Sequence, residues 1–216
     1  MVTHQTAGWI RRRGVRLVGI LSGVLPAVGL IATYAAGGFV IDPVKEITIR
    51  TGRLAITFLL LSLACTPAAV ITRVGRLVQA RAPLGLWALA FAGAHALAFV
   101  GWDYRFDLAL LGLDIAYQRY VLVGAGAFLL LALLGVTSIP SVRSGMGRWW
   151  RRVQRTVYLA AGLAVWHVLW VKKNPLEAWL YPVILIALLG LRLPPVRRAI
   201  ARLRRARSVE ESKETV

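Results

Sequence analysis

The sequence predicts an all-α, polytopic membrane protein, and three observations support that prediction. Hydrophobic residues make up 58% of the 216 residues, and the mean hydropathy is +0.65, whereas a soluble domain is about 45–50% apolar. Six segments approach the roughly 17–25 residues that a helix needs to cross a bilayer core of about 30 Å. Apolar runs such as FLLLALLGV lack the polar–apolar alternation of a membrane β-strand.

The six expected spans form a helical bundle. The first follows a basic start, but its apolar run is long and no convincing A-x-A cleavage site follows, so we expect a retained helix rather than a signal peptide. The fifth is short and is extended by flanking Trp residues and by Lys and Arg side chains that reach the interface. The expected spans are 15–34, 54–72, 82–101, 120–139, 156–171 and 176–193.

Basic residues orient this bundle. Of the 27 Lys and Arg residues, 20 lie at the N-terminal end up to Arg16, in the 73–81 and 140–155 loops and in the C-terminal stretch from Arg192 onward, and seven lie on the opposite side. By the positive-inside rule, both termini are expected to be cytoplasmic. The net charge of +18 is thereby explained by topology, and we expect membrane lipid rather than nucleic acid as the partner of the basic segments.

Three regions are expected along the chain. Residues 1–14 form a cytoplasmic lead, residues 15–193 the transmembrane domain and residues 194–216 a basic cytoplasmic tail. The tail is interpreted as a solvated stop-transfer segment, whose basic residues keep it from crossing the membrane. The alternative is an amphipathic helix that lies on anionic lipid. We recognise no internal repeat and no soluble domain.

Two of the three histidines lie inside expected spans. His95 is 14 residues from the start of the third span and His167 is 12 residues from the start of the fifth, counted from the preceding arginine. Because both spans enter from the same side, a rise of 1.5 Å per residue places the two imidazoles within about 3 Å of one depth. Small residues around them are expected to leave a slot for a flat group, bordered by Trp87, Phe91, Phe99, Trp166 and Trp170.

Two facing neutral imidazoles suit the axial positions of a heme iron. The chain has no CxxCH motif, which excludes c-type attachment, and its single cysteine excludes a cysteine-based metal cage. A b-type heme held by His95 and His167 is therefore one interpretation. A proton or ion pathway is another, although the expected spans contain no acidic residue except Glu177, the second residue of the sixth. Structural hydrogen bonding is the third, and the residues alone leave all three open.

Four stretches of the chain carry a resemblance to a known family. They are DPVKEITIRTGR at 42–53, LGLWALAFAGAH at 84–95, RW followed by TVYLA within 148–160, and WHVLW at 166–170. With these motifs in this order, the sequence resembles the MsrQ family (formerly YedZ), part of the ferric-reductase-like transmembrane group. The resemblance covers roughly residues 15–195.

The resemblance implies a b-type cytochrome of the bacterial inner membrane, with FMN also associated. It implies electron transfer from the respiratory quinone pool to a periplasmic molybdenum-containing subunit that reduces methionine sulfoxide, so this chain would be an electron-transfer subunit rather than the catalytic one. His95 and His167 fall on the family's heme-linked positions. Some relatives carry another histidine where this chain has Gln154, so we expect one heme b. A proton-coupled transporter and a redox-inactive membrane anchor are the alternative functions.

The side away from the cytoplasm holds the candidate contacts with heme and partner. Its docking surface is expected in the 35–53 and 102–118 loops and the KKNP turn at 172–175, with contacts from Asp42, Lys45 and Glu46, whose simpler role is loop capping. Basic side chains there are candidates to pair heme propionates, and their simpler role is snorkelling at the membrane edge. The propionate candidates are Arg53, Arg105, Arg119 and Lys172.

Overall fold

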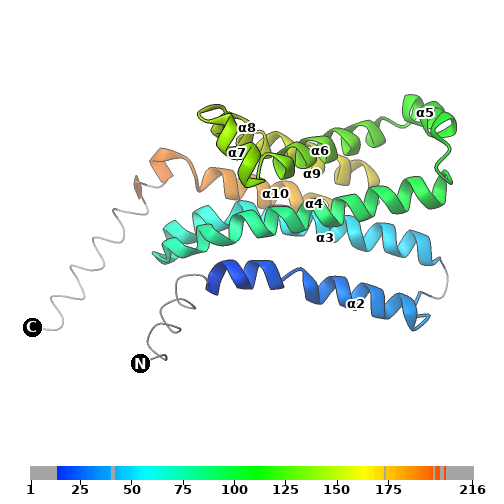
Figure 1. Ribbon diagram of the computed structural model, residues 1–216, viewed down its shortest axis with the longest axis horizontal. Helices are drawn as coiled ribbons and strands as arrows, with labels where there is room; N and C mark the ends of the chain where they lie inside the picture. Colours follow the sequence, from blue (N-terminus) through cyan, green and yellow to red (C-terminus); the bar gives the residue numbers. More distant parts are fainter. Residues whose placement is uncertain (1–13, 40–41, 173, 197, 200–201, 203–216) are drawn as a thin grey trace, which may run out of the picture.

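The computed structural model describes residues 14–39, 42–172, 174–196, 198–199 and 202, and the regular structure within them is helical. The expected all-α fold is therefore confirmed for this part of the chain. Long helices lie side by side and alternate in direction, so their ends form two opposite faces (Figure 1). The expected lead and basic tail lie almost wholly outside the described residues.

Helices α3 and α4 form the middle of the bundle (Figure 1). Helix α2 packs on one side of them, and α6, α9 and α10 lie on the other, with α7 and α8 linking α6 to α9. The helices are α2 (Val24–Ala35), α3 (Pro43–Thr72), α4 (Arg81–Ala98), α5 (Leu108–Tyr117), α6 (Arg119–Val136), α7 (Pro140–Met146), α8 (Trp149–Gln154), α9 (Val157–Val171) and α10 (Pro175–Gly190), with a 3₁₀ segment at Gly75–Ala80 and a π-helical turn at Phe99–Asp103.

Four helical segments of the described chain are long and apolar enough to cross a membrane: Gly14–Ala35, Pro43–Thr72, Gly75–Trp102 and Arg119–Val136. They overlap the first four expected spans. Helices α9 and α10, which match the fifth and sixth, have 15 and 16 residues. At 1.5 Å per residue each is about 23–24 Å long, less than a straight crossing of about 30 Å requires. That all six expected segments cross the membrane therefore stays a prediction.

Helix α3 begins 11 residues before the second expected span. Its 30 residues extend about 45 Å, well beyond the hydrocarbon core. The Asp42 side chain accepts a hydrogen bond from the Lys45 N–H at 3.0 Å, and Pro43 occupies the first helical position, both favourable at a helix start. A Glu46–Arg50 pair at 2.9 Å follows on one face.

The expected loops thus contain much helix. Most of the 35–53 loop is the first three turns of α3, the 102–118 loop contains α5, and the 140–155 loop contains α7 and α8. Apolar length identifies only segments that cross the bilayer, so polar helical turns outside it escape that criterion. The 172–175 turn is short, as expected, although residue 173 lies outside the described part.

The core lies between α3, α4, α6 and α9. Ala88 of α4 and Ala160 and Ala161 of α9 are completely buried, as is Leu63 of α3. Alanines at such positions let helix backbones approach closely, which is how helices associate without a hydrophobic driving force between them. Much of the small-residue pattern therefore serves helix packing.

The two ends of the bundle differ in charge. At one end, termed the basic end, lie the arginines of segments 73–81 and 140–155 together with Arg192 (left in Figure 1). The opposite end holds the start of α3, the α5 segment and the 172–175 turn. This arrangement agrees with the alternation behind the positive-inside assignment, and the side of the membrane stays a prediction.

Candidate functional site

The structure brings His95 and His167 together. They lie on the parallel helices α4 and α9, near the ends of those helices that are away from the basic end. Their ring centroids are 6.1 Å apart and the ring planes are inclined by 80°. Two imidazoles from distant parts of the chain therefore form one cluster inside an otherwise apolar bundle.

Each ring is held by a backbone carbonyl of a neighbouring helix. The His95 Nδ1 lies 2.8 Å from the Thr48 carbonyl oxygen on α3, and the His167 Nδ1 lies 2.8 Å from the Tyr120 carbonyl oxygen on α6. A carbonyl oxygen only accepts hydrogen bonds, so in each neutral ring Nδ1–H donates. The lone pair is then on Nε2, the nitrogen left free to bind a metal or a proton.

Two glycines let the rings approach those carbonyls. A Cβ atom at Gly52 of α3 would lie 2.9 Å from the His95 Nδ1, and one at Gly124 of α6 would lie 2.7 Å from the His167 Nδ1. Carbon–nitrogen separations this short are well inside van der Waals contact. Any larger residue at either position would push the imidazole off its carbonyl.

These contacts repeat along the chain. In each half a carbonyl is followed four residues later by the glycine and 47 residues later by the histidine. The second set follows the first by 72 residues throughout, and the fully buried Ala88 and Ala160 obey the same offset. Helix pairs α3–α4 and α6–α9 therefore present two copies of one half-site, a repeat of contacts that the sequence pattern alone does not reveal.

The spacing of the pair fits two ligands on one metal ion. An imidazole nitrogen binds a metal at about 2 Å, and the ring centre lies about 1.1 Å behind it, so two opposed ligands give a centroid separation of about 6 Å. No group of three or more His, Cys, Asp or Glu side chains able to hold a metal occurs in the described chain. Two imidazoles suit a metal whose other four ligands come from a macrocycle, as in heme.

A comparison with known families agrees with this geometry. Residues 51–165 match the family described as ferric reductase like transmembrane component, which is more than half of the chain. The chain belongs to this family. The match includes His95, Tyr120 and both glycines, and ends two residues before His167. The family generally binds heme, and with the four apolar helices it identifies this ferric-reductase-like chain as an integral membrane protein of redox type.

The aromatic residues expected to border a slot in this ferric-reductase-like chain instead pack against other aromatic rings or lie partly exposed on the surface. Trp87 and Phe91 stack on each other at 5.7 Å and continue to Phe58 of α3. Trp166 and Trp170 are about half exposed on the outer face of α9. Helical spacing gives a residue's depth but not the direction in which it points, so depth alone misplaced these side chains. Phe99 packs against Tyr104 beyond the end of α4.

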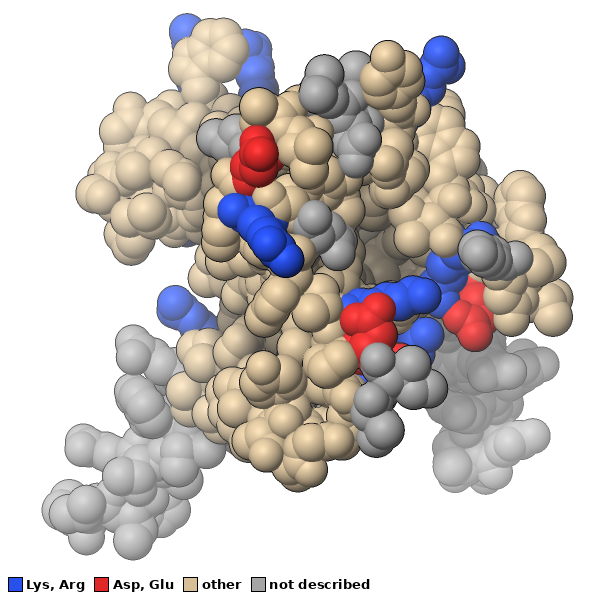
Figure 2. Space-filling model, turned by 90° about the vertical axis from the view of Figure 1, so that its right-hand side faces the viewer, with Lys and Arg blue, Asp and Glu red and all other residues tan. Residues whose placement is uncertain are grey.

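Two of the four basic candidates meet at the end near the histidines. The Glu177 carboxylate lies 3.7 Å from an Arg53 guanidinium nitrogen, and the same carboxylate accepts a hydrogen bond from Lys172. Figure 2 shows this end of the molecule, with acidic and basic side chains side by side around a hollow. Arg105 and Arg119 form no ion pair within the described residues.

The three candidate docking residues of the ferric-reductase-like chain have roles within α3 itself. Asp42 caps the helix with its side chain, using the Lys45 N–H. Glu46 pairs with Arg50 one turn later. The structure therefore shows a helix cap and an ion pair within one helix for these residues, and their contact with a partner stays a prediction.

Gln154 joins α8 to α6. Its side-chain amide donates to the Thr137 Oγ1 at 3.1 Å and to the Leu134 carbonyl at 3.4 Å. The Gln154 side chain of this ferric-reductase-like chain thus forms a structural link between the two helices.

Proposed function

We propose that this chain is a membrane b-type cytochrome holding one heme between His95 and His167. The observation that carries the proposal is the pair of imidazoles 6.1 Å apart, each with Nδ1 occupied by a carbonyl and Nε2 free. The family supports a redox function, because it generally binds heme. A bound heme would supply a one-electron carrier inside the membrane.

The residues of the chain would prepare the two ligands. The Thr48 and Tyr120 carbonyls select the tautomer in which Nε2 is unprotonated, and such second partners also orient a ligand and raise its basicity. Gly52 and Gly124 permit that approach. The buried alanines of α4 and α9 let each helix pack closely on its neighbours, α4 chiefly on α3 and α9 chiefly on α6, and so support the helices that carry the histidines.

One heme is the count that this chain supports best. The third histidine of the sequence, His4, belongs to the N-terminal lead. Gln154, a poor iron ligand, is engaged with Thr137 and Leu134. A second bis-histidine heme therefore has no ligand pair to use.

The place of the histidines favours electron exchange at the end opposite the basic end. His95 lies three residues before the end of α4 and His167 four residues before the end of α9, about 5–6 Å along each axis. Arg53 and Lys172 lie at this end and are candidates for pairing propionates, which would compete there with the Glu177 carboxylate that both contact. Arg105 and Arg119 are candidates as well, and neither forms an ion pair within the described residues.

The resemblance to the MsrQ family supplies the finer part of the proposal. The chain would take electrons from the quinone pool of a bacterial inner membrane and deliver them to a periplasmic molybdenum-containing methionine-sulfoxide reductase. FMN enters through that resemblance alone. The surface around the start of α3, the α5 segment and the 172–175 turn is the proposed docking face for this partner.

The test is the visible spectrum of the purified protein before and after reduction with dithionite. His95→Ala and His167→Ala should each abolish or strongly disturb the reduced b-type bands, because each removes one axial ligand. His4→Ala, which removes a histidine from the lead, is the matched control and should leave the bands unchanged.

Two other results would replace this proposal. A colourless protein that shows pH-dependent flux in vesicles, lost in both interior variants, would indicate a proton-coupled transporter. A colourless protein whose interior histidines are dispensable for partner activity would indicate a redox-inactive anchor.

A further inference from the structure

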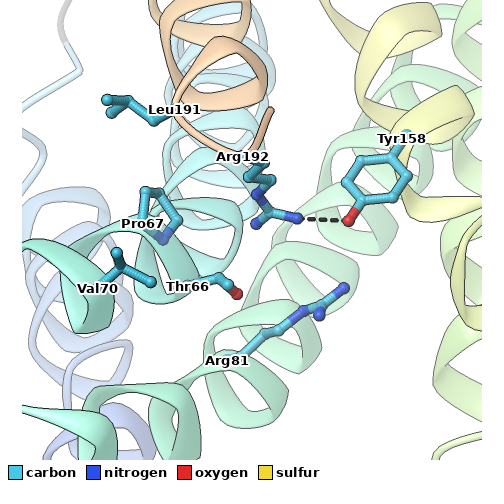
Figure 3. A pocket seen from close by; sticks show the side chains of 7 residues that line it. All are labelled: Thr66, Pro67, Val70, Arg81, Tyr158, Leu191 and Arg192. Atoms are coloured by element: carbon cyan, nitrogen blue, oxygen red, sulfur yellow. Dashed lines mark hydrogen bonds between the residues drawn. The ribbon is translucent and has the colours of Figure 1, made fainter. Parts of the chain in front are cut away.

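A cavity at the basic end is lined by two arginines and no acidic residue. Its volume is about 210 Å³, and it lies between the ends of α3, α4 and α9 and the residues that follow α10. Liquid water occupies roughly 30 Å³ per molecule, so the cavity has room for several waters or for one phosphate group with its ester atoms. Figure 3 shows Arg81 and Arg192 turned toward the same space.

The Arg192 guanidinium group is held in place by two hydrogen bonds, but one of its N–H donors has no acceptor among the described residues. Its guanidinium donates to the Tyr158 hydroxyl and to the Leu63 carbonyl, which fixes the group at the cavity wall. Its Nε is buried and has no hydrogen-bond partner among the described residues. An unpartnered buried donor on this partly buried cation costs free energy that a bound acceptor would recover.

Further donors converge on the same cavity. The Tyr158 hydroxyl accepts from Arg192 and so has its own proton to donate. Thr66 lines the cavity, and its hydroxyl forms none of the bonds to the preceding turn that Thr48, Thr57 and Thr72 form within α3. The ion pairs of the described residues, all at the opposite end, include neither Arg81 nor Arg192.

We propose that this cavity binds the phosphate of an anionic membrane lipid. Two guanidinium groups without a carboxylate repel each other, and an oxyanion relieves that repulsion while accepting charge-assisted hydrogen bonds. The apolar part of the wall, including Pro67, Val70 and Leu191, suits the glycerol and first acyl carbons rather than a free ion. A lipid seated here joins four helices of the bundle at the membrane interface.

The experiment uses the full chain, delipidated in a non-ionic detergent and titrated with phosphatidylglycerol. Native mass spectrometry counts the retained lipid, and the thermal unfolding midpoint reports its affinity, since a ligand that binds only the folded state raises that midpoint. We expect one tightly bound phosphatidylglycerol. Arg81→Gln and Arg192→Gln should each weaken its apparent affinity about tenfold or more.

The controls separate the sources of the phosphate. Arg148→Gln removes an exposed charge from the same end outside the cavity and should leave the affinity unchanged. Arg192 also ties Leu63 to Tyr158, so if its variant does not fold, Arg81→Gln and Thr66→Val carry the test. Equal binding of phosphatidylglycerol by wild type and Arg81→Gln, or of phosphatidylcholine and phosphatidylglycerol by wild type, would overturn the proposal. Stabilisation by inorganic phosphate without any by lipid would overturn the lipid assignment.

Discussion

At the scale of single residues, the position of the two histidine rings depends on main-chain carbonyl groups and on glycines rather than on polar side chains. The acceptors for His95 and His167 are main-chain carbonyls, of Thr48 and Tyr120, and the space for each ring comes from a missing Cβ. Substituting Thr48 or Tyr120 would leave the carbonyl in place. The glycines are therefore the positions at which mutation tests this arrangement directly.

We predict that Gly52→Ala and Gly124→Ala displace the rings. The new methyl would stand 2.9 or 2.7 Å from an imidazole nitrogen, and overpacking of this kind costs about 1–3 kcal/mol. The reduced b-type bands should shift or weaken in both variants, measured on purified protein at equal heme loading. Gly126→Ala, whose Cβ would meet Leu163 at an ordinary 3.6 Å, and Gly162→Ala, which meets nothing within 4 Å, should keep the wild-type spectrum. Equal spectra in all four variants would contradict the role assigned to the two glycines.

At the scale of elements, α2 and the turns before it approach α4 closely at two glycines: Gly19, which faces Ala80 and Pro83, and Gly23, which faces Trp87. A Cβ at Gly23 would lie 2.0 Å from the Trp87 ring of α4, and the Trp87 indole N–H donates to the Ile20 carbonyl at 2.7 Å. The rest of the helix is largely exposed, as suits a helix facing lipid on most sides. Loss of the Trp87 contact should therefore loosen this helix without disturbing the histidine pair.

Gly23→Ala tests this attachment. The methyl would collide with the indole, so we expect a loss of about 1–3 kcal/mol in unfolding free energy, measured by denaturant titration in mixed micelles. Gly29→Ala lies on the same helix with nothing within 4 Å of its Cβ, and should be neutral or slightly stabilising because alanine favours helix. The heme bands should survive in both. A stability loss of equal size in Gly29→Ala would show that helix propensity rather than packing is responsible.

At the scale of the whole molecule, the two ends have separate chemistry. The histidines lie toward the end that carries Arg53, Lys172 and Glu177, and the cavity with Arg81 and Arg192 lies at the basic end. The 72-residue offset relates α3–α4 to α6–α9, so each half of the bundle contributes one histidine to a shared centre. The positive-inside rule then assigns the basic end to the cytoplasm.

Cysteine labelling in intact cells checks this orientation. In a Cys65→Ala background, Ser144→Cys adds a thiol at the basic end and Tyr117→Cys adds one on α5 at the opposite end, both at exposed positions. A membrane-impermeant maleimide should label Tyr117→Cys in intact cells and Ser144→Cys only after lysis. The reverse pattern would place the histidine pair near the cytoplasmic face and remove a periplasmic partner from the proposal.

Local sequence was enough to predict the helical class, four of the crossing segments and the matched depth of His95 and His167, because apolar length and rise per residue are local properties of a helix. The tertiary structure decided what those residues touch. It turned Trp166 and Trp170 outward, extended α3 so that Thr48 reaches His95, and placed Gly52 and Gly124 against the rings. Rotation of one helix against another depends on packing between segments far apart in the chain, and no single segment encodes it.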